Sequence, residues 1–315
     1  MILRLILTRG ATAMVTLLAV SIIIFSVVEL LPGDIAMMVL GRESTAEARA
    51  AFRAQLRLDR PAYERYWLWL SGFAQGDLGR SLVSKRPVAD MIRERLPNTL
   101  ILGAHALLLY IPLSLILAII SAVNRERPAD HAVTLITLIG NSLPEFVVGT
   151  ALLLLFAVMI PIFPVMSLIN QADTYPELLH MIALPVIVLT ISMMPHAVRM
   201  LRDNLIDVLG SDYVRMATLK GLPNKAVVSK HALPNSLIPL LNIVAVELAF
   251  LIGSVVVVEQ IFSYPGIGGL LVSAVFMRDA PVVEAVAILV SGIYIFGNLL
   301  ADIGTILLSP RLRTS

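Results

Sequence analysis

The sequence predicts an all-α integral membrane protein with six transmembrane helices and an extracytoplasmic insert after the first. Of its 315 residues, 58% are hydrophobic and 15% are charged, whereas soluble domains average about 45–50% apolar and about 25% charged residues. Six apolar runs each approach or exceed the roughly 20 residues that cross a bilayer, and none contains Lys or Arg. The net charge of +2 does not favour a nucleic-acid partner, and the chain has no cysteine for disulfides, thiolate metal sites or cysteine catalysis.

The first predicted span lies in the N-terminal segment 1–31. Its apolar run, 11–31, is too long for the core of a signal peptide, and the following LLPGD lacks a small-x-small cleavage pattern, so we expect a retained helix. The insert then occupies 32–98. A five-helix core follows over 99–308, with the spans 99–122, 133–160, 181–198, 237–259 and 282–308.

The distribution of Lys and Arg predicts the orientation. With the N-terminus in the cytoplasm, twelve of the 24 Lys and Arg fall in cytoplasmic segments, and one falls in the outside loops 161–180 and 260–281. The other 11 lie in the insert, which is longer than about 60 residues and so largely escapes the positive-inside rule. We therefore expect both termini, the connecting segment 199–236 and the tail 309–315 in the cytoplasm.

The insert contains two predicted helices. In STAEARAAFRAQLRL, Ser44 is followed three residues later by Glu47, a pattern typical of a capping box. The second helix is expected after Pro61, in YERYWLWLSGF, where Trp67 and Trp69 are interpreted as interfacial anchors or packing residues. The runs GDLGRS and RLPN are interpreted as turns.

The connecting segment predicts a short helix between two sharp turns. Ser211 or Asp212 can cap a helix over Tyr213–Lys220, Gly221 suits the position just after it, and Pro223 prevents its continuation. A helix of about two turns is unstable alone in water, so it needs a surface to pack on. An ordinary connector between spans is the alternative interpretation.

A second short helix is expected after these turns. Asn224 can cap it, and it runs through about Leu233 with Pro234 beyond. It leads the chain back to the membrane.

Two acidic residues within the predicted spans are candidates for a translocation path. A charge at the bilayer centre costs about 2.5–3.5 kcal/mol on insertion scales, so Glu145 and Glu247 should face a partner, the bundle interior or water. They could line a path for a cationic or amine-bearing solute. Hydrogen bonding to neighbouring helices is the alternative. The five histidines show no metal-ligand spacing, and His105 and His196 are expected to be core or boundary residues.

The stretch MATLKGLPNKAVVSKHALPNSLIP resembles the EAA loop of permease subunits of type I ABC importers, whose core is E-A-A, three residues, G, nine residues, I-x-L-P. Gly221 matches the glycine, and Leu233 and Pro234 fall at the required spacing. Arg215, Met216 and His231 depart from the general pattern in the manner of the dipeptide/oligopeptide/nickel branch. Further stretches resemble that branch in order along the chain: ELLPGD, LDRP, GDLGRS, RLPNT, VVVVEQIFSYPGIGGLL, RDAPVVEAV and SPRLR.

The resemblance implies a type I importer permease in a bacterial cytoplasmic membrane. Its partners would be a second homologous permease, two cytoplasmic ATPase subunits, an extracytoplasmic binding protein and membrane lipid. ATP and Mg would bind on the ATPases and no cofactor on this chain, which has no GxxxxGK[ST]. The implied cargo is a peptide, although nickel complexes, glycosides and opine-like compounds remain alternatives.

The resemblance also implies that the EAA-type loop docks on an ATPase subunit. Arg215 and Lys220 could pair with acids of that subunit, while Tyr213, Met216 and Leu219 could fill apolar pockets. The full set of implied docking residues is Asp212, Tyr213, Arg215, Met216, Ala217, Leu219, Lys220, Gly221, His231, Leu233 and Pro234.

Three other classes of protein explain the sequence less well. Intramembrane acids would suit an ion-coupled secondary transporter, but no inverted repeat is visible and the EAA-like loop has no role there. An intramembrane hydrolase or transferase is disfavoured because GxSxG and HExxH are missing. A structural scaffold leaves the ordered motifs unexplained.

Overall fold

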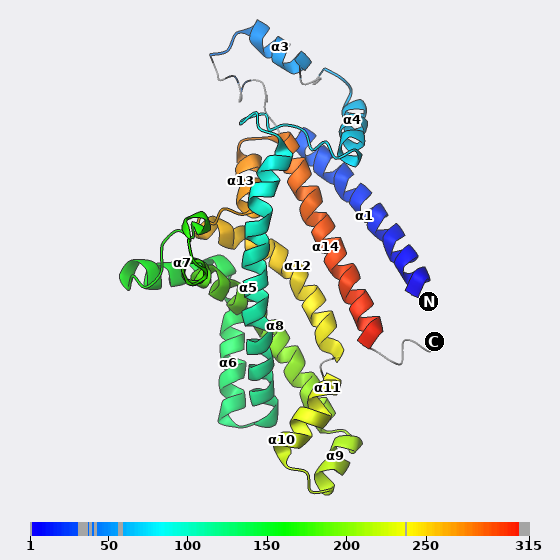
Figure 1. Ribbon diagram of the computed structural model, residues 1–315, viewed down its shortest axis with the longest axis vertical. Coiled ribbons are helices and arrows are strands. Elements are labelled where there is room, and N and C mark those ends of the chain that lie inside the picture. The colour runs from blue at the N-terminus through cyan, green and yellow to red at the C-terminus, as the bar shows by residue number, and fades with distance from the viewer. Residues whose placement is uncertain are drawn as a thin grey trace. The chain divides into compact units, whose positions relative to one another are not determined.

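The computed structural model describes residues 2–30, 37, 40, 43–55, 59–236 and 238–308. Their regular structure is helical, as predicted, and the chain divides into two compact units (Figure 1). The first unit comprises 1–99 and 265–295, and the second comprises 100–264 and 296–315. The predicted tail 309–315 lies outside the described residues.

The first unit contains α1 (Ile2–Leu30), α3 (Ala46–Gln55), α4 (Ala62–Ala74) and α13 (Ile267–Phe276), with the beginnings of α5 (Val88–Val123) and α14 (Ala280–Leu308). The prediction of a helix after Pro61 is confirmed by α4. This helix packs against α1, where Ser21 and Tyr66 share a hydrogen bond of 2.8 Å and the rings of Phe25 and Trp69 lie 6.1 Å apart.

The predicted cap of the first insert helix is wrong by one residue. Helix α3 begins at Ala46, and the hydroxyl of Thr45 accepts a hydrogen bond from the backbone N–H of Ala48 at 3.2 Å. Thr45 therefore takes the capping position predicted for Ser44, because its oxygen reaches the third N–H of the helix.

Two of the sequence motifs meet in the first unit. Asp279, in RDAP, is buried and accepts hydrogen bonds from the hydroxyl of Ser81 and from the backbone N–H of Leu82, the latter at 2.8 Å. Ser81 belongs to GDLGRS, whose turn is confirmed by the positive φ of 77° at Gly79. The buried carboxylate thus ties the insert to the turn before α14.

The predicted turn at RLPN is wrong, since α5 continues through it. Contacts with the residues before α13 accompany this helical conformation. The side-chain amide of Asn98 donates to the carbonyl of Pro265 at 2.8 Å, and the hydroxyl of Thr99 accepts from the N–H of Ile267 at 2.8 Å.

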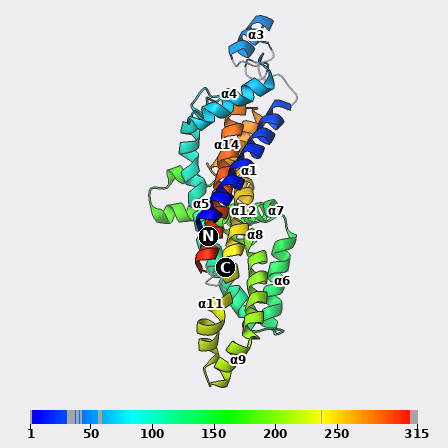
Figure 2. The ribbon, with the colours of Figure 1, turned by 90° about the vertical axis from the view of Figure 1, so that its right-hand side faces the viewer.

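The second unit is built around α8 (Tyr175–Leu209), which packs against α6 (Pro128–Ser142), α7 (Glu145–Leu153) and α12 (Ile238–Ile261). Helices α6 and α8 lie side by side in both views (Figures 1 and 2). The predicted span 181–198 lies within α8, and the helix continues eleven residues beyond it to Leu209. The first part of the predicted connecting segment is therefore an extension of the helix.

The predicted span 133–160 is not one straight helix. Helix α6 ends before Leu143, whose extended conformation (φ −97°, ψ 127°) precedes Pro144, and α7 continues at an angle of 100° into a π-helix over Leu154–Met159. Proline disfavours the helical conformation in the preceding residue, which explains the break.

Within the described residues, four helical segments are long and apolar enough to cross a bilayer. These are Thr8–Leu30, Val88–Val123, Tyr175–Leu209 and Ala280–Leu299, and the bent α6–α7 pair makes a fifth when counted as one span. The protein is thus an all-helical protein with several apolar helices of membrane-spanning length.

Candidate functional site

The predicted short helix of the connecting segment is α9 (Asp212–Leu219). Ser211 occupies its N-cap position, but the hydroxyl donates backward to the carbonyl of Val208 at 2.5 Å and makes no capping bond. The helix ends at Leu219 with Lys220 as its C-cap, one residue earlier than predicted, and Gly221 has a φ of 80°. The backbone N–H of Gly221 donates to Thr218 and that of Leu222 to Ala217, the two bonds of a Schellman motif.

The chain then returns through α10 (Asn224–Ala226), a π-helical turn (Val227–Ala232) and α11 (Leu233–Ser236). Pro223 holds the N-cap position, so the expectation that Asn224 caps this helix is wrong. The expectation that the helix ends before Pro234 is also wrong. Pro234 is the second residue of α11, which follows the π-helical turn without a break.

One face of α9 is buried against the ends of two long helices. Val214 and Ala217 lie in an apolar cluster with Ala122 of α5, Leu205 of α8 and the two buried residues of the π-helical turn, Val227 and Ala232. The hydroxyl of Tyr213 also donates to the carbonyl of His231 at 3.4 Å. The surface on which the helix packs therefore lies within this chain, and any displacement of α9 acts on α5 and α8.

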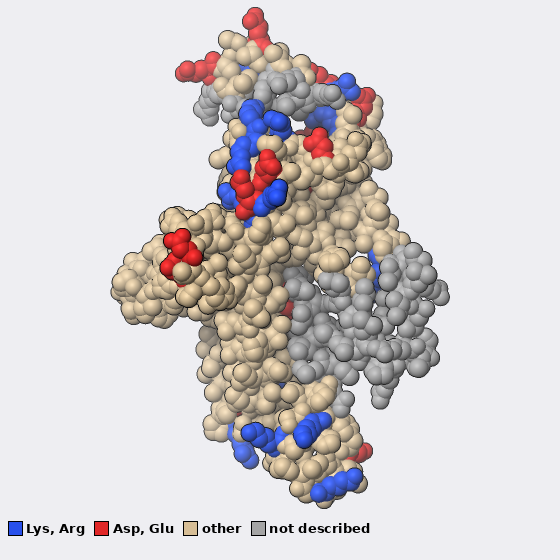
Figure 3. All heavy atoms as spheres, in the orientation of Figure 1, with Lys and Arg blue, Asp and Glu red and all other residues tan. Residues whose placement is uncertain are grey.

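The opposite face of α9 exposes apolar side chains. Leu219 is 76% exposed, Met216 is 54% exposed and Tyr213 is 46% exposed, although all three are large and hydrophobic. Exposed basic residues also lie on or next to α9 and on the returning arm (224–236): Arg215, Lys220, Lys225 and Lys230. Figure 3 shows Lys and Arg gathered at the end of the unit formed by these helices. We call this face, with its basic residues, the α9 surface.

The predicted docking residues differ in their exposure to solvent. Asp212 and Gly221 are exposed beside the α9 surface, whereas Ala217 is buried beneath it. His231 and Leu233 are half-buried on the returning arm, and Pro234 is exposed there.

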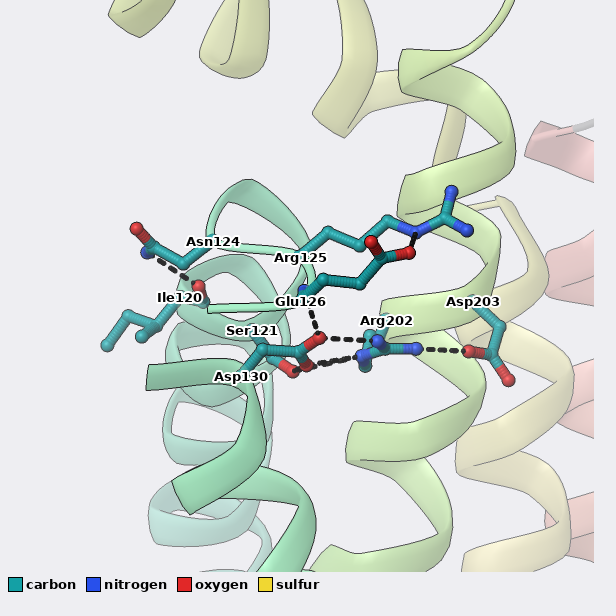
Figure 4. Close-up of polar contacts among 8 residues, drawn as sticks. All are labelled: Ile120, Ser121, Asn124, Arg125, Glu126, Asp130, Arg202 and Asp203. Atoms are coloured by element: carbon teal, nitrogen blue, oxygen red, sulfur yellow. Dashed lines mark hydrogen bonds and ion pairs between the residues drawn. The ribbon is translucent and has the colours of Figure 1, made fainter. Parts of the chain in front are cut away.

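A polar network joins α8 to α6 near the α9 surface (Figure 4). Arg202 donates from Nε and Nη2 to the two carboxylate oxygens of Asp130, each at 2.7 Å. Asp130 also accepts from the hydroxyl of Ser121, at the end of α5, and from the backbone N–H of Glu126 at 2.9 Å. Helices α5, α6 and α8 are thus joined through one carboxylate.

The contact between Asp130 and Arg202 is a two-point ion pair. Asp130 is buried, and both of its carboxylate oxygens accept from the Arg202 guanidinium. Hydrogen bonds of this kind, between two charged groups in a fixed geometry, are stronger than those between neutral groups.

Glu145 lines an open groove at the bend between α6 and α7. The groove has a volume of about 540 Å³ and is bounded by three segments of the second unit, namely the α6–α7 bend, α8 and α12. Its lining residues are Gly140, Asn141, Leu143, Glu145, Ser192, Phe250, Gly253 and Ser254.

Glu247 has a different environment. Its side chain is 3% exposed, and one carboxylate oxygen lies 3.0 Å from Nδ1 of His196, whose own side chain is 56% exposed. Of the two predicted path residues, Glu145 therefore lies in an open groove, whereas Glu247 has a close partner on α8.

Sequence reasoning missed His196, Asp130 and Arg202 as parts of these sites. His196 was expected to be a core or boundary residue, but it pairs with an acid 51 positions away. Arg202 and Asp130 are 72 positions apart, and no local pattern marks their pairing. Only two features of the sequence hint at this pair: Asp130 is an acid just inside the start of a helix, and Arg202 lies beyond the end of an apolar run.

The comparisons with known proteins identify the class. Residues 114–314 match the family described as "Binding-protein-dependent transport system inner membrane component", and residues 2–103 match the N-terminal region of such membrane components. The chain belongs to this family. It is a multi-pass inner-membrane permease subunit of a peptide-type ABC importer, in which ATPase and binding protein are separate subunits.

Two curated relatives match along nearly the whole chain. The "Glutathione transport system permease protein GsiC" of Escherichia coli is 37% identical over 298 residues, covering 95% of each chain. A "Putative peptide transport system permease protein" of Brucella melitensis is 34% identical over 313 residues, covering 99% of each.

A solved structure shares the fold. It describes inward-facing conformations of the MetNI methionine ABC transporter and matches with a TM-score of 0.54 and 16% identity. The match covers 70% of this chain and 96% of the other.

Proposed function

We propose that this chain forms half of the translocation path of an ATP-driven importer for a peptide or a similar small solute delivered by a binding protein. The names of its relatives, which refer to glutathione and peptide transport, support this class of cargo. The complex contains a second homologous permease and two ATPase subunits. ATP and Mg bind on the ATPases, and no cofactor binds this chain.

The observation that carries the proposal is the α9 surface. Large apolar side chains exposed on a short helix, together with exposed basic residues on the same helix and the returning arm, suit a protein partner with an apolar groove and acidic margins. The partner proposed here is the ATPase. Docking residues on the exposed face bind it, and Val214 and Ala217 on the buried face connect it to α5 and α8.

We also propose six crossings with both termini in the cytoplasm. The α6–α7 pair counts as one broken crossing and α12 as the sixth, and the insert 32–98 lies outside. Support comes from the apolar runs and from the position of Lys and Arg in the sequence.

The mechanism is alternating access. ATP closes the ATPase pair, the α9 surface moves with it, and the ends of α5 and α8 follow because they share an apolar cluster with α9. Since Asp130 holds α6 to α8, the bend at Leu143 moves with them. The path, with Glu145 and Glu247 as its candidate solute-contacting acids, then opens outward, and ATP hydrolysis resets it.

Co-purification tests this function. Leu219→Glu places a charge on the α9 surface and should abolish recovery of the ATPase pair, with insertion of the chain unchanged. Val123→Glu is the matched control, since Val123 is an exposed apolar residue at the end of α5. Wild-type chain that brings down no ATPase, or ATP-independent uptake driven by an ion gradient, supports the alternative of an ion-coupled secondary transporter.

A further inference from the structure

The groove at the α6–α7 bend has an unbalanced charge. Among the lining residues that the structure describes, Glu145 is the one ionisable residue. The other polar groups are the amide of Asn141 and the hydroxyls of Ser192 and Ser254. A groove with one carboxylate and neutral hydrogen-bonding groups attracts cations and repels anions.

The carboxylate of Glu145 is available to a ligand. It is half-buried, and no hydrogen bond or ion pair joins it to another side chain in the described part of the protein. Glu247 differs, because His196 lies 3.0 Å from its carboxylate and solvent barely reaches it. Of the two predicted path acids, Glu145 is the one that can take a partner from outside the chain.

The remaining lining provides space and an apolar contact. Phe250 is 64% exposed, and a ring beside a carboxylate suits a group that is both cationic and apolar. At Gly253 an added Cβ would meet no atom within 4 Å. The groove is therefore open beside Gly253, which also lines it.

We propose that this groove binds the protonated amino group of the transported solute at Glu145, and that it favours solutes with a free ammonium group over those whose amino group is blocked. The proposal rests on the proposed function and deepens it by naming the group of the cargo that is recognised. Asn141, Ser192 and Ser254 supply hydrogen bonds that depend little on the solute's side chains. Glu145 is the residue that distinguishes an amino group from a blocked one.

Three size-matched probes test the charge selection. Ala-Ala amide carries a net positive charge, Ala-Ala is a zwitterion, and N-acetyl-Ala-Ala is an anion without an ammonium group. Their dissociation constants are measured by equilibrium dialysis against the assembled transporter in nanodiscs without binding protein, so that the binding protein's own selectivity does not enter. We expect Ala-Ala amide to bind most tightly and N-acetyl-Ala-Ala at least tenfold more weakly.

Two variants locate the binding. Glu145→Gln should weaken Ala-Ala amide about tenfold and leave N-acetyl-Ala-Ala unchanged, whereas Glu126→Gln, which alters an exposed acid outside the groove, should change neither. Gly253→Leu should weaken all three probes by filling the groove. Gly292→Leu is its control, since Gly292 is a helical glycine with nothing within 4 Å of an added Cβ.

Equal binding of the three probes, no measurable binding of Ala-Ala amide to the wild-type assembly, or unchanged binding in Glu145→Gln would overturn the proposal. These outcomes leave the proposed function standing if the chain still brings down the ATPases and supports ATP-dependent uptake. Loss of the ATPases from the wild-type chain refutes the proposed function, whatever the probes do.

Discussion

Arg202 and Asp130, 72 residues apart in the chain, form a two-point ion pair that fixes α8 to the first turn of α6. Asp130 is buried, and Arg202 is largely shielded from solvent. The pair lies where α5, α6 and α8 meet, close in sequence to Ala122 and Leu205 of the apolar cluster beneath α9. Movement of the α9 surface can therefore reach α6 through one side-chain contact.

Asp130→Asn should impair both stability and transport. Removing one partner of a buried pair leaves the other charge uncompensated, at a cost of about 3–5 kcal/mol in fully buried cases and less here because Arg202 is partly exposed. We expect a lower melting temperature and loss of ATP-dependent uptake. Arg202→Lys should be intermediate, since it keeps the charge but loses the two-point geometry.

Exchanging the two charges should not rescue transport. In Asp130→Arg/Arg202→Asp, the backbone N–H of Glu126 still points toward position 130, where it now meets another donor. Recovery of wild-type uptake in this double variant would show that the charge pair alone matters and that the network does not.

Variants on the two faces of α9 should separate docking from folding. Leu219→Ala removes exposed apolar surface, so it should reduce ATPase binding with an unchanged melting temperature. Val214→Asp puts a charge into the apolar cluster, and we expect it to reduce both ATPase binding and thermal stability. Equal melting temperatures for the two variants would contradict this division of the helix.

The turn at Gly221 should tolerate residues according to backbone preference alone. An added Cβ meets nothing within 4 Å, so a substitution costs only the strain of a φ of 80°, about 1–2 kcal/mol for an ordinary residue. Gly221→Asn should keep most of the uptake, because Asn tolerates this conformation, and Gly221→Val should lose it. Uptake assays with matched expression levels check the order, and similar activity of both variants would exclude a role for the turn.

The contact between His196 and Glu247 predicts a difference in stability between two histidine variants. His196→Gln keeps an N–H donor near the buried carboxylate, whereas His196→Leu leaves it without one, at a cost of about 1–3 kcal/mol. The melting temperature of the purified chain should therefore fall further for Leu than for Gln. The reverse order would mean that His196 does not stabilise Glu247.

Much of this architecture could be predicted from local patterns. The helix of α9, the glycine after it and the helix after Pro61 follow from caps, turns and apolar periodicity, which act over a few residues. The break at Leu143 also has a local cause, Pro144. The apolar run 133–160 nevertheless predicted one continuous span. Pairings such as Arg202 with Asp130 or His196 with Glu247 depend on how helices pack, and a single sequence contains no signal that joins such distant positions.

The hydrogen bonds from Ser81 and Leu82 to Asp279 have a consequence for how such permeases can be recombined. Ser81 lies in the stretch matched by the N-terminal family model and Asp279 in the stretch matched by the other, yet both belong to one compact unit. A hybrid gene joined near residue 100 would take the donors from one parent and the acceptor from the other. The insert and the turn before α14 would therefore have to come from one parent, although residues 100–264 of the second unit separate them in the chain.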